Sequence, residues 1–167
     1  MILKSIFRFI FVIIFQVLVF NNIQFSGFVN PLYYVLFILL LPIKTPAWLT
    51  LLSSFILGAI IDVFSQSPGL HASASVLIAY IRPTIISSIK TTGETNTDLE
   101  PSLSNMGFRW FISYALILIF IHHFIYFSLE VFRFGNFLIT FYRIIISSFA
   151  TFIAIILSQL LTFKKSQ

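Results

Sequence analysis

The chain has 167 residues, of which 59% are hydrophobic and only 9% are charged, and its mean hydropathy is +1.03. This composition excludes a soluble globular protein and predicts an all-α integral membrane protein, with room for about six spans of roughly 20 residues. The net charge of +5 indicates membrane topology instead of nucleic-acid binding because the cations lie mostly at the ends of apolar runs, and the lack of cysteine excludes disulfides and thiolate sites.

The first predicted span covers about 6–24. It follows Lys4 and Arg8, as the hydrophobic region of a signal peptide would. The polar stretch Asn21-Asn22-Ile23-Gln24 offers no small-residue cleavage site, so we expect the span to be retained.

The second predicted span covers 29–43 and is short for a helix that crosses a bilayer. Pro31 and Pro42 bracket its apolar run. The other spans are predicted over the longer apolar stretches that follow, and together they make one transmembrane domain over 1–167. Their ranges are 47–65, 71–89, 108–129 and 137–161.

The stretch 90–107 differs from the spans because it holds three of the five acids and few apolar side chains. It predicts a loop that is mobile or ordered by a partner. Glu94, Asp98 and Glu100 are therefore candidate partner contacts, and an unconstrained linker is the alternative.

Six spans with both termini in the cytoplasm satisfy the positive-inside rule. The opposite side then receives Arg133, beside Glu130, and the cations at or near the other ends of the spans fall on the cytoplasmic side. These are Lys4, Arg8, Lys44, Lys90, Arg109, Lys164 and Lys165.

Polar residues in the third and fourth spans share single helix faces. Gly58 and Asp62 are four residues apart, and His71 is followed at helical spacing by Ser75 and Arg82. Ionisable groups in hydrocarbon are costly and usually face a protein interior or a wet cavity. We therefore expect these two faces to form an inner seam of the bundle.

A depth estimate at about 1.5 Å per residue places Asp62, His122, His123 and Arg143 within roughly 5 to 12 Å of the outer surface. Pairing an acid with an arginine avoids two separate burial costs, so we expect Asp62 to pair with Arg143, with a histidine nearby. Such a pair could fix the neighbours in the bundle or belong to a proton or ion pathway.

The sequence predicts no metal site and no cofactor. Adjacent His122 and His123 point about 100° apart on a helix, and no other ligand has zinc-like spacing. No catalytic motif is present: there is no nucleophile elbow, no glycine-rich phosphate loop and no HExxH. In the last span, small or polar residues recur on one face, from Thr140 through Ser147 and Thr151 to Ser158, which favours close helix packing.

With these motifs the chain resembles the rod shape-determining protein MreD family, especially its forms from Bacteroidetes-like bacteria. The resemblance covers nearly the full length. The stretches that carry it are Asn21–Gln24, Pro31–Tyr34 leading to Leu39–Pro42, Gly58 through Asp62–Ser65, Pro68–Ala72 leading to Ala79–Pro83, Arg109–Phe111 and His122–His123.

The resemblance implies a non-enzymatic, multi-pass subunit of the bacterial inner membrane that belongs to the cell-wall elongation (rod) complex and is needed for cell shape. Members of the family are similar in fold to the small substrate-binding subunits of vitamin transporters. They are thought to bind the single-span scaffold protein MreC and, through it, MreB, RodA and a penicillin-binding transpeptidase.

Two other functions stay open on the sequence. A small solute-binding subunit or transporter would line a polar cavity with Asp62, His71, Arg82 and Arg143. A membrane-embedded lipid enzyme would use His122, His123 and Asp62 as acid and base groups, although a phosphate-binding or nucleophile motif is missing.

Overall fold

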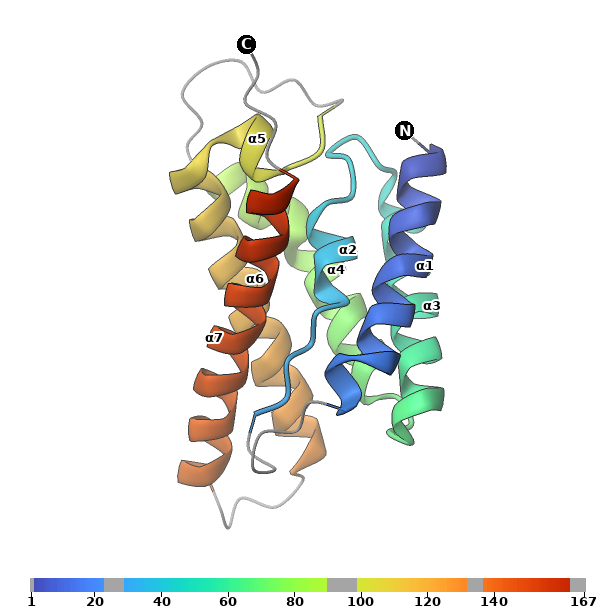
Figure 1. Ribbon diagram of the computed structural model, residues 1–167, viewed down its shortest axis with the longest axis vertical. Coiled ribbons are helices and arrows are strands. Elements are labelled where there is room, and N and C mark those ends of the chain that lie inside the picture. The colour runs from blue at the N-terminus through green and yellow to red at the C-terminus, as the bar shows by residue number, and fades with distance from the viewer. Residues whose placement is uncertain (1, 23–28, 90–98, 132–136, 163–167) are drawn as a thin grey trace.

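The computed structural model describes residues 2–22, 29–89, 99–131 and 137–162. Within these ranges the ordered elements are helical, and Figure 1 shows their arrangement. They are α1 (Ile2–Leu18), the 3-10 turn η1 (Phe20–Asn22), α2 (Val35–Leu39), α3 (Ala47–Ser65), α4 (Leu70–Ser88), α5 (Leu103–Met106), α6 (Phe108–Glu130) and α7 (Phe137–Leu161).

Four of the described helices are long and apolar enough to cross a membrane, by length and composition. They are the first helix with η1, α3, α6 and α7. All four carry exposed leucine, isoleucine or phenylalanine side chains, which suits a surface in contact with acyl chains. The expected all-helical fold is thus confirmed, with four helices that are suited to cross a membrane.

The long helices form two groups with a segment between them. Figure 1 shows α1 and α3 on one side, α6 and α7 on the other, and the chain that carries α2 running between the groups. The first described turn of α1 and the last turn of α7 lie at the same end of the bundle, beside α5. We call this the terminal end, and the end where α3 leads into α4 the opposite end.

The predicted helical span at 29–43 is wrong. Only Val35–Leu39 forms a helix, and the chain from Asn30 to Leu32 has no regular secondary structure. Every residue from Pro31 to Leu41 is buried, so this run faces protein on all sides. An all-round apolar run of this length fits a buried core segment better than a lipid-facing helix. We call residues 30–41 the central segment.

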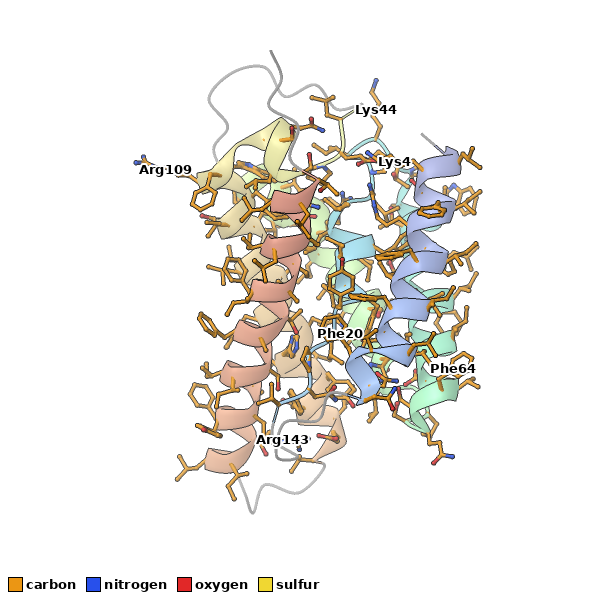
Figure 2. All side chains as sticks on the ribbon, in the orientation of Figure 1. Lys4, Phe20, Lys44, Phe64, Arg109 and Arg143 are labelled. Carbon is orange, nitrogen blue, oxygen red and sulfur yellow. The ribbon has the colours of Figure 1, made fainter. Side chains whose placement is uncertain are left out.

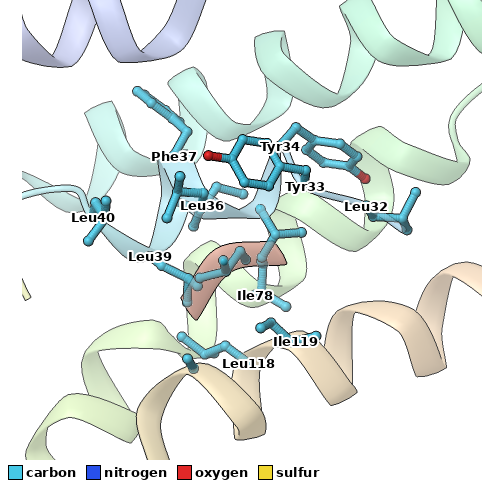
Figure 3. Packing of buried hydrophobic residues seen from close by; sticks show 14 of the residues in the cluster. Leu32, Tyr33, Tyr34, Leu36, Phe37, Leu39, Leu40, Ile78, Leu118 and Ile119 are labelled. Atoms are coloured by element: carbon cyan, nitrogen blue, oxygen red, sulfur yellow. The ribbon is translucent and has the colours of Figure 1, made fainter. Parts of the chain in front are cut away.

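The central segment forms the middle of the hydrophobic core. Its side chains pack against Ile78 of α4 and against Leu118 and Ile119 of α6, as Figure 3 shows. Tyr33 also stacks on Phe20 at 5.2 Å between ring centroids, which joins the segment to the end of the first helix. Non-helical backbone at membrane depth is tolerated where it is buried in protein, and the surrounding helices bury this segment.

Helix α4 has 19 residues but is not among the four apolar helices. Its buried face is partly polar, with His71, Ser75 and Arg82 all enclosed by neighbouring elements. It packs between α3 and α6 and also touches α2. These buried polar residues lower the mean hydropathy of α4, whereas Leu77 and Tyr80 on its other side are exposed.

The predicted loop 90–107 is only partly a loop. Residues 99–107 are packed on the bundle, where the short helix α5 begins after Ser102, whose hydroxyl accepts from the Asn105 amide at 3.3 Å. Leu103 is buried. The expected loop thus contains a helical turn at Leu103–Met106, and Glu94 and Asp98 lie outside the described residues.

Candidate functional site

Buried polar side chains from the surrounding helices bond the backbone of the central segment. At its beginning, two hydroxyls of α7 accept backbone N–H groups: Ser147 Oγ from Asn30 at 3.0 Å and Thr151 Oγ1 from Leu32 at 2.9 Å. Both are fully buried. The polar face predicted for the last span therefore serves this segment, in addition to any helix packing.

Gln16 of α1 continues this support. Its carbonyl oxygen accepts from the Tyr34 amide at 3.3 Å, and its amide nitrogen donates to the Pro31 carbonyl at 3.1 Å. The same nitrogen donates to Asn21 Oδ1 at 3.0 Å. A fully buried glutamine whose oxygen and nitrogen both bond the segment fixes its position relative to α1.

The carbonyl groups at the end of α2 are satisfied by two arginines and a tyrosine. Arg82 donates through Nη2 to the Leu41 carbonyl and through Nε to the Tyr114 hydroxyl at 2.8 Å. Tyr114 in turn donates to the Leu39 carbonyl at 3.0 Å, and Arg8 donates to the Leu40 carbonyl at 2.9 Å. The last carbonyl groups of a helix have no N–H partner within that helix. Here the side chains of Arg8, Arg82 and Tyr114 supply the missing donors.

The Tyr34 hydroxyl lies between two imidazoles near the centre of the bundle. His71 Nδ1 is 2.9 Å away and His122 Nε2 is 3.0 Å away. A hydroxyl has one proton, so at most one imidazole can accept from Tyr34 and at least one must donate to it. The predicted residues His71 and His122 are thus brought together, but by a tyrosine that the sequence analysis did not select.

His123 points to α7, away from that cluster. Its Nδ1 lies 2.9 Å from the Ile119 carbonyl, which can only accept, so this nitrogen carries the proton. Nε2 then accepts from the Thr151 hydroxyl at 3.1 Å. Because Thr151 also accepts the Leu32 amide, His123 orients the hydroxyl that holds the central segment.

Asp62 does not pair with Arg143, contrary to our expectation. Its two carboxylate oxygens accept the backbone N–H groups of His71 and Ala72, each at 3.0 Å, and the Ser67 hydroxyl at 3.1 Å. Asp62 therefore caps the N-terminus of α4 from the neighbouring helix, where the helix dipole also favours a negative charge. The backbone N–H groups of α4 are the partners of the Asp62 carboxylate, in place of the Arg143 side chain that we expected.

Gly58 makes this cap possible because it lets α3 and α4 approach closely. A Cβ atom at Gly58 would lie 2.5 Å from the Ala72 Cα atom and 2.7 Å from the His71 carbonyl oxygen. Both are backbone atoms, which cannot move aside by a rotamer change. The seam expected from Gly58, Asp62 and His71 is thus a real contact.

Arg143 pairs with Glu130 across the α6–α7 connection. Its Nη1 lies 2.8 Å from Glu130 Oε2, and its guanidinium lies 4.6 Å from the ring centroid of Phe127. Both side chains of the pair are partly exposed, at 21% and 32%. Figure 2 shows Arg143 near the opposite end of the bundle.

Glu100, one of the three candidate partner contacts, bonds within the chain. It is buried, and its Oε2 accepts from Lys4 Nζ at 2.9 Å and Arg8 Nη2 at 2.8 Å. Burial by itself would raise the pKa of Glu100, but the bonds and charges of Lys4 and Arg8 outweigh it and lower that pKa. This carboxylate ties the described part of the predicted loop to α1.

The four residues proposed to line a solute cavity do not converge on one site, although Asp62 accepts the backbone N–H group of His71. Asp62 caps α4, Arg82 bonds Tyr114 and Leu41, and Arg143 pairs with Glu130. Within the described ranges no group of three or more His, Asp or Glu side chains could hold a metal ion. Of the four, Arg82 bonds the backbone of the central segment and His71 contacts its Tyr34 side chain.

Tyr34, Tyr114 and Gln16 also belong to this network. The amide of Gln16 within an apolar run indicates a span that faces other helices, but the sequence does not show which backbone groups it bonds. The tyrosines gave none, because aromatic residues are common in spans and only the fold shows which hydroxyl meets a buried partner.

No protein-family model, no curated protein and no solved structure matches the chain.

Proposed function

We propose that this chain is a non-enzymatic, multi-pass subunit of the bacterial inner membrane that works by binding other membrane proteins. One observation carries the proposal: buried polar side chains from several helices bond the central segment or cap α4, among them Gln16, Asp62, Arg82, Ser147 and Thr151. A catalyst or carrier needs polar groups directed at a substrate, whereas a packed bundle with apolar outer faces offers contact surfaces.

The partner we propose is an MreC-like single-span scaffold of the cell-wall elongation complex, and through it MreB, RodA and a penicillin-binding transpeptidase. This part rests on the resemblance to the MreD family, whose most specific stretch runs from Gly58 to Arg82. The distribution of charge supports the proposed orientation with cytoplasmic termini: Lys4, Lys44 and Arg109 lie at the terminal end (Figure 2).

The candidate contact surface is the outer side of the stretch from Gly58 to Arg82 and the adjoining part of α3. A shallow groove of about 600 Å³ runs between α3 and α4, lined among others by Phe55, Ala72, Ser73 and Tyr80. Small residues on α4 would let the backbone of a partner helix approach closely in lipid. A single-span scaffold supplies one such helix.

The test is cross-linking in the native membrane, followed by gentle detergent extraction of the tagged chain and mass spectrometry. We expect the single-span scaffold and the wall synthases to be recovered with it. Ser73→Trp, which fills the groove, should reduce that recovery several-fold, whereas Ile153→Trp on the exposed face of α7 is the matched control. Recovery of an ATPase pair or a bound small molecule would instead indicate a transporter subunit.

A further inference from the structure

A second cleft lies between α1 and α7 at the terminal end, on a different face from the α3–α4 groove. Its volume is about 560 Å³, which falls within the roughly 300–1,000 Å³ typical of small-molecule sites. Tyr33 and Leu36 of the central segment line it from the inside. Figure 1 shows that segment between the two helices. We call this space the α1–α7 cleft.

The walls of the α1–α7 cleft combine exposed apolar side chains with a charged group. Phe7 and Phe11 of α1 and Leu161 of α7 line it, and all three are exposed on the outer surface of the bundle. Because α1 and α7 are both long enough to span a membrane, these side chains face acyl chains. The cleft is therefore open toward lipid along its apolar part.

The charged part consists of Lys4, Arg8 and Glu100. Both cations bond the same carboxylate oxygen, Glu100 Oε2, so the three groups carry one net positive charge. The side chain of Lys4 is 67% exposed, and an ammonium has three N–H donors, of which Lys4 uses one on Glu100. An anionic group at the mouth of the cleft would find both charge and donors.

We propose that the α1–α7 cleft binds an anionic phospholipid, with an acyl chain along Phe7, Phe11 and Leu36 and the phosphate at Lys4. The cleft joins an apolar channel open to lipid to a positive group at the level of the headgroups, and an anionic amphiphile has these two features in the same order. Cations near the membrane surface attract anionic lipids with about 1 kcal/mol each, or about fivefold in affinity. The site goes beyond the proposed partner-binding function and does not require it.

The first test is native mass spectrometry of the full chain in neutral detergent, titrated with phosphatidylglycerol or with phosphatidylcholine of the same acyl chains. We expect phosphatidylglycerol to bind at least fivefold more tightly. Equal binding of the two lipids would overturn the proposal. Full competition by inorganic phosphate would also overturn it, because that result indicates a simple anion site.

Two variants and one control locate the lipid. Lys4→Gln keeps the Arg8–Glu100 bond and should weaken phosphatidylglycerol binding about fivefold. Ser158→Phe, which fills the cleft from α7, should reduce binding of both lipids. Arg109→Gln removes one exposed cation at the same end outside the cleft and should leave binding unchanged. Equal losses for Lys4→Gln and Arg109→Gln would refute a specific site.

A photo-activated cross-linker in place of Phe7 identifies the occupant in the native membrane. Recovery of a phospholipid adduct supports the proposal. Recovery of a protein adduct would show that a partner helix covers the cleft and would overturn it. Thermal unfolding of each variant without added lipid checks that the fold is kept.

Discussion

Asp62 and Glu100 are both buried carboxylates, but they lie at opposite ends of the bundle and are neutralised in different ways. Asp62 receives two backbone N–H groups and a hydroxyl. Glu100 receives a lysine and an arginine. Backbone donors of a packed helix are fixed in place, whereas Lys4 is a long side chain that is mostly exposed. We therefore expect the region around Asp62 to be rigid and costly to change, and the region around Glu100 to respond to salt and pH.

The largest effect is expected for Asp62→Ala, which leaves two buried N–H groups at the start of α4 without an acceptor. Each such group costs about 1–3 kcal/mol, so the free energy of unfolding should fall by about 3 kcal/mol or more. Asp62→Asn retains one acceptor oxygen and should lose less. Unfolding in a detergent denaturant, followed by circular dichroism, measures both changes. If Asp62→Ala lowers the free energy of unfolding by less than about 1 kcal/mol, the Asp62 region is not more costly to change than the Glu100 region.

Gly58→Ala should come next. The added methyl group meets the α4 backbone at 2.5 Å, so the two helices must move apart. Overpacking of this kind costs about 1–3 kcal/mol. Ser53→Ala in the same helix is the control and should change stability by less than about 0.5 kcal/mol. If both variants unfold alike, the close approach of α3 and α4 is not needed.

The Glu100 region should depend on pH, with a smaller effect. The folded-state pKa of Glu100 is lowered from its usual 4.5, so its contribution is complete above that value and is lost as the pH falls through the lowered value. We expect a contribution below about 1 kcal/mol because Lys4 is exposed and the pair is screened by salt. Glu100→Gln should flatten the stability profile below pH 4.5. An unchanged profile would show that the Glu100 contacts contribute nothing.

The smallest effect is expected at the Arg143–Glu130 pair, where both side chains are partly exposed. A double-mutant cycle with Arg143→Met and Glu130→Gln should give a coupling free energy below about 1 kcal/mol. The two cycles that join Asp62 to Arg143 and Asp62 to Glu130 should give none. Strong coupling between Asp62 and Arg143 would restore the pair that the sequence suggested.

The sequence alone predicted much of the helical frame. Helices α3, α4, α6 and α7 begin and end within one residue of the ranges expected from the apolar runs. Long apolar runs separated by glycine, proline and charged residues leave few alternatives, because each backbone group in lipid must be bonded within its own helix. The polar seam from Gly58 to His71 was also predictable, since helical periodicity places its residues on facing sides.

The partners of each polar residue depended on tertiary structure. The sequence showed that Asp62, Arg82 and Arg143 lie inside or near apolar runs, and pairing opposite charges was the simplest way to satisfy them. In the folded protein, backbone groups are partners as well. The N-terminal N–H groups of α4 donate to Asp62, and the Leu41 carbonyl accepts from Arg82. A pattern of side chains cannot reveal these partners, because every residue carries the same backbone groups whatever its type.

The sequence by itself determined that this chain is an apolar helical protein suited to a membrane and where α3, α4, α6 and α7 lie, because hydropathy and helical periodicity are local properties of the chain. It placed the first span at 6–24, whereas α1 runs from Ile2 to Leu18. Only the tertiary structure decided that the run at 30–41 is a buried, mostly non-helical segment. A short apolar run is compatible with a helix in lipid or with a chain inside a bundle. The choice depends on whether side chains such as Gln16, Thr151 and Arg82, distant in sequence, reach its backbone groups.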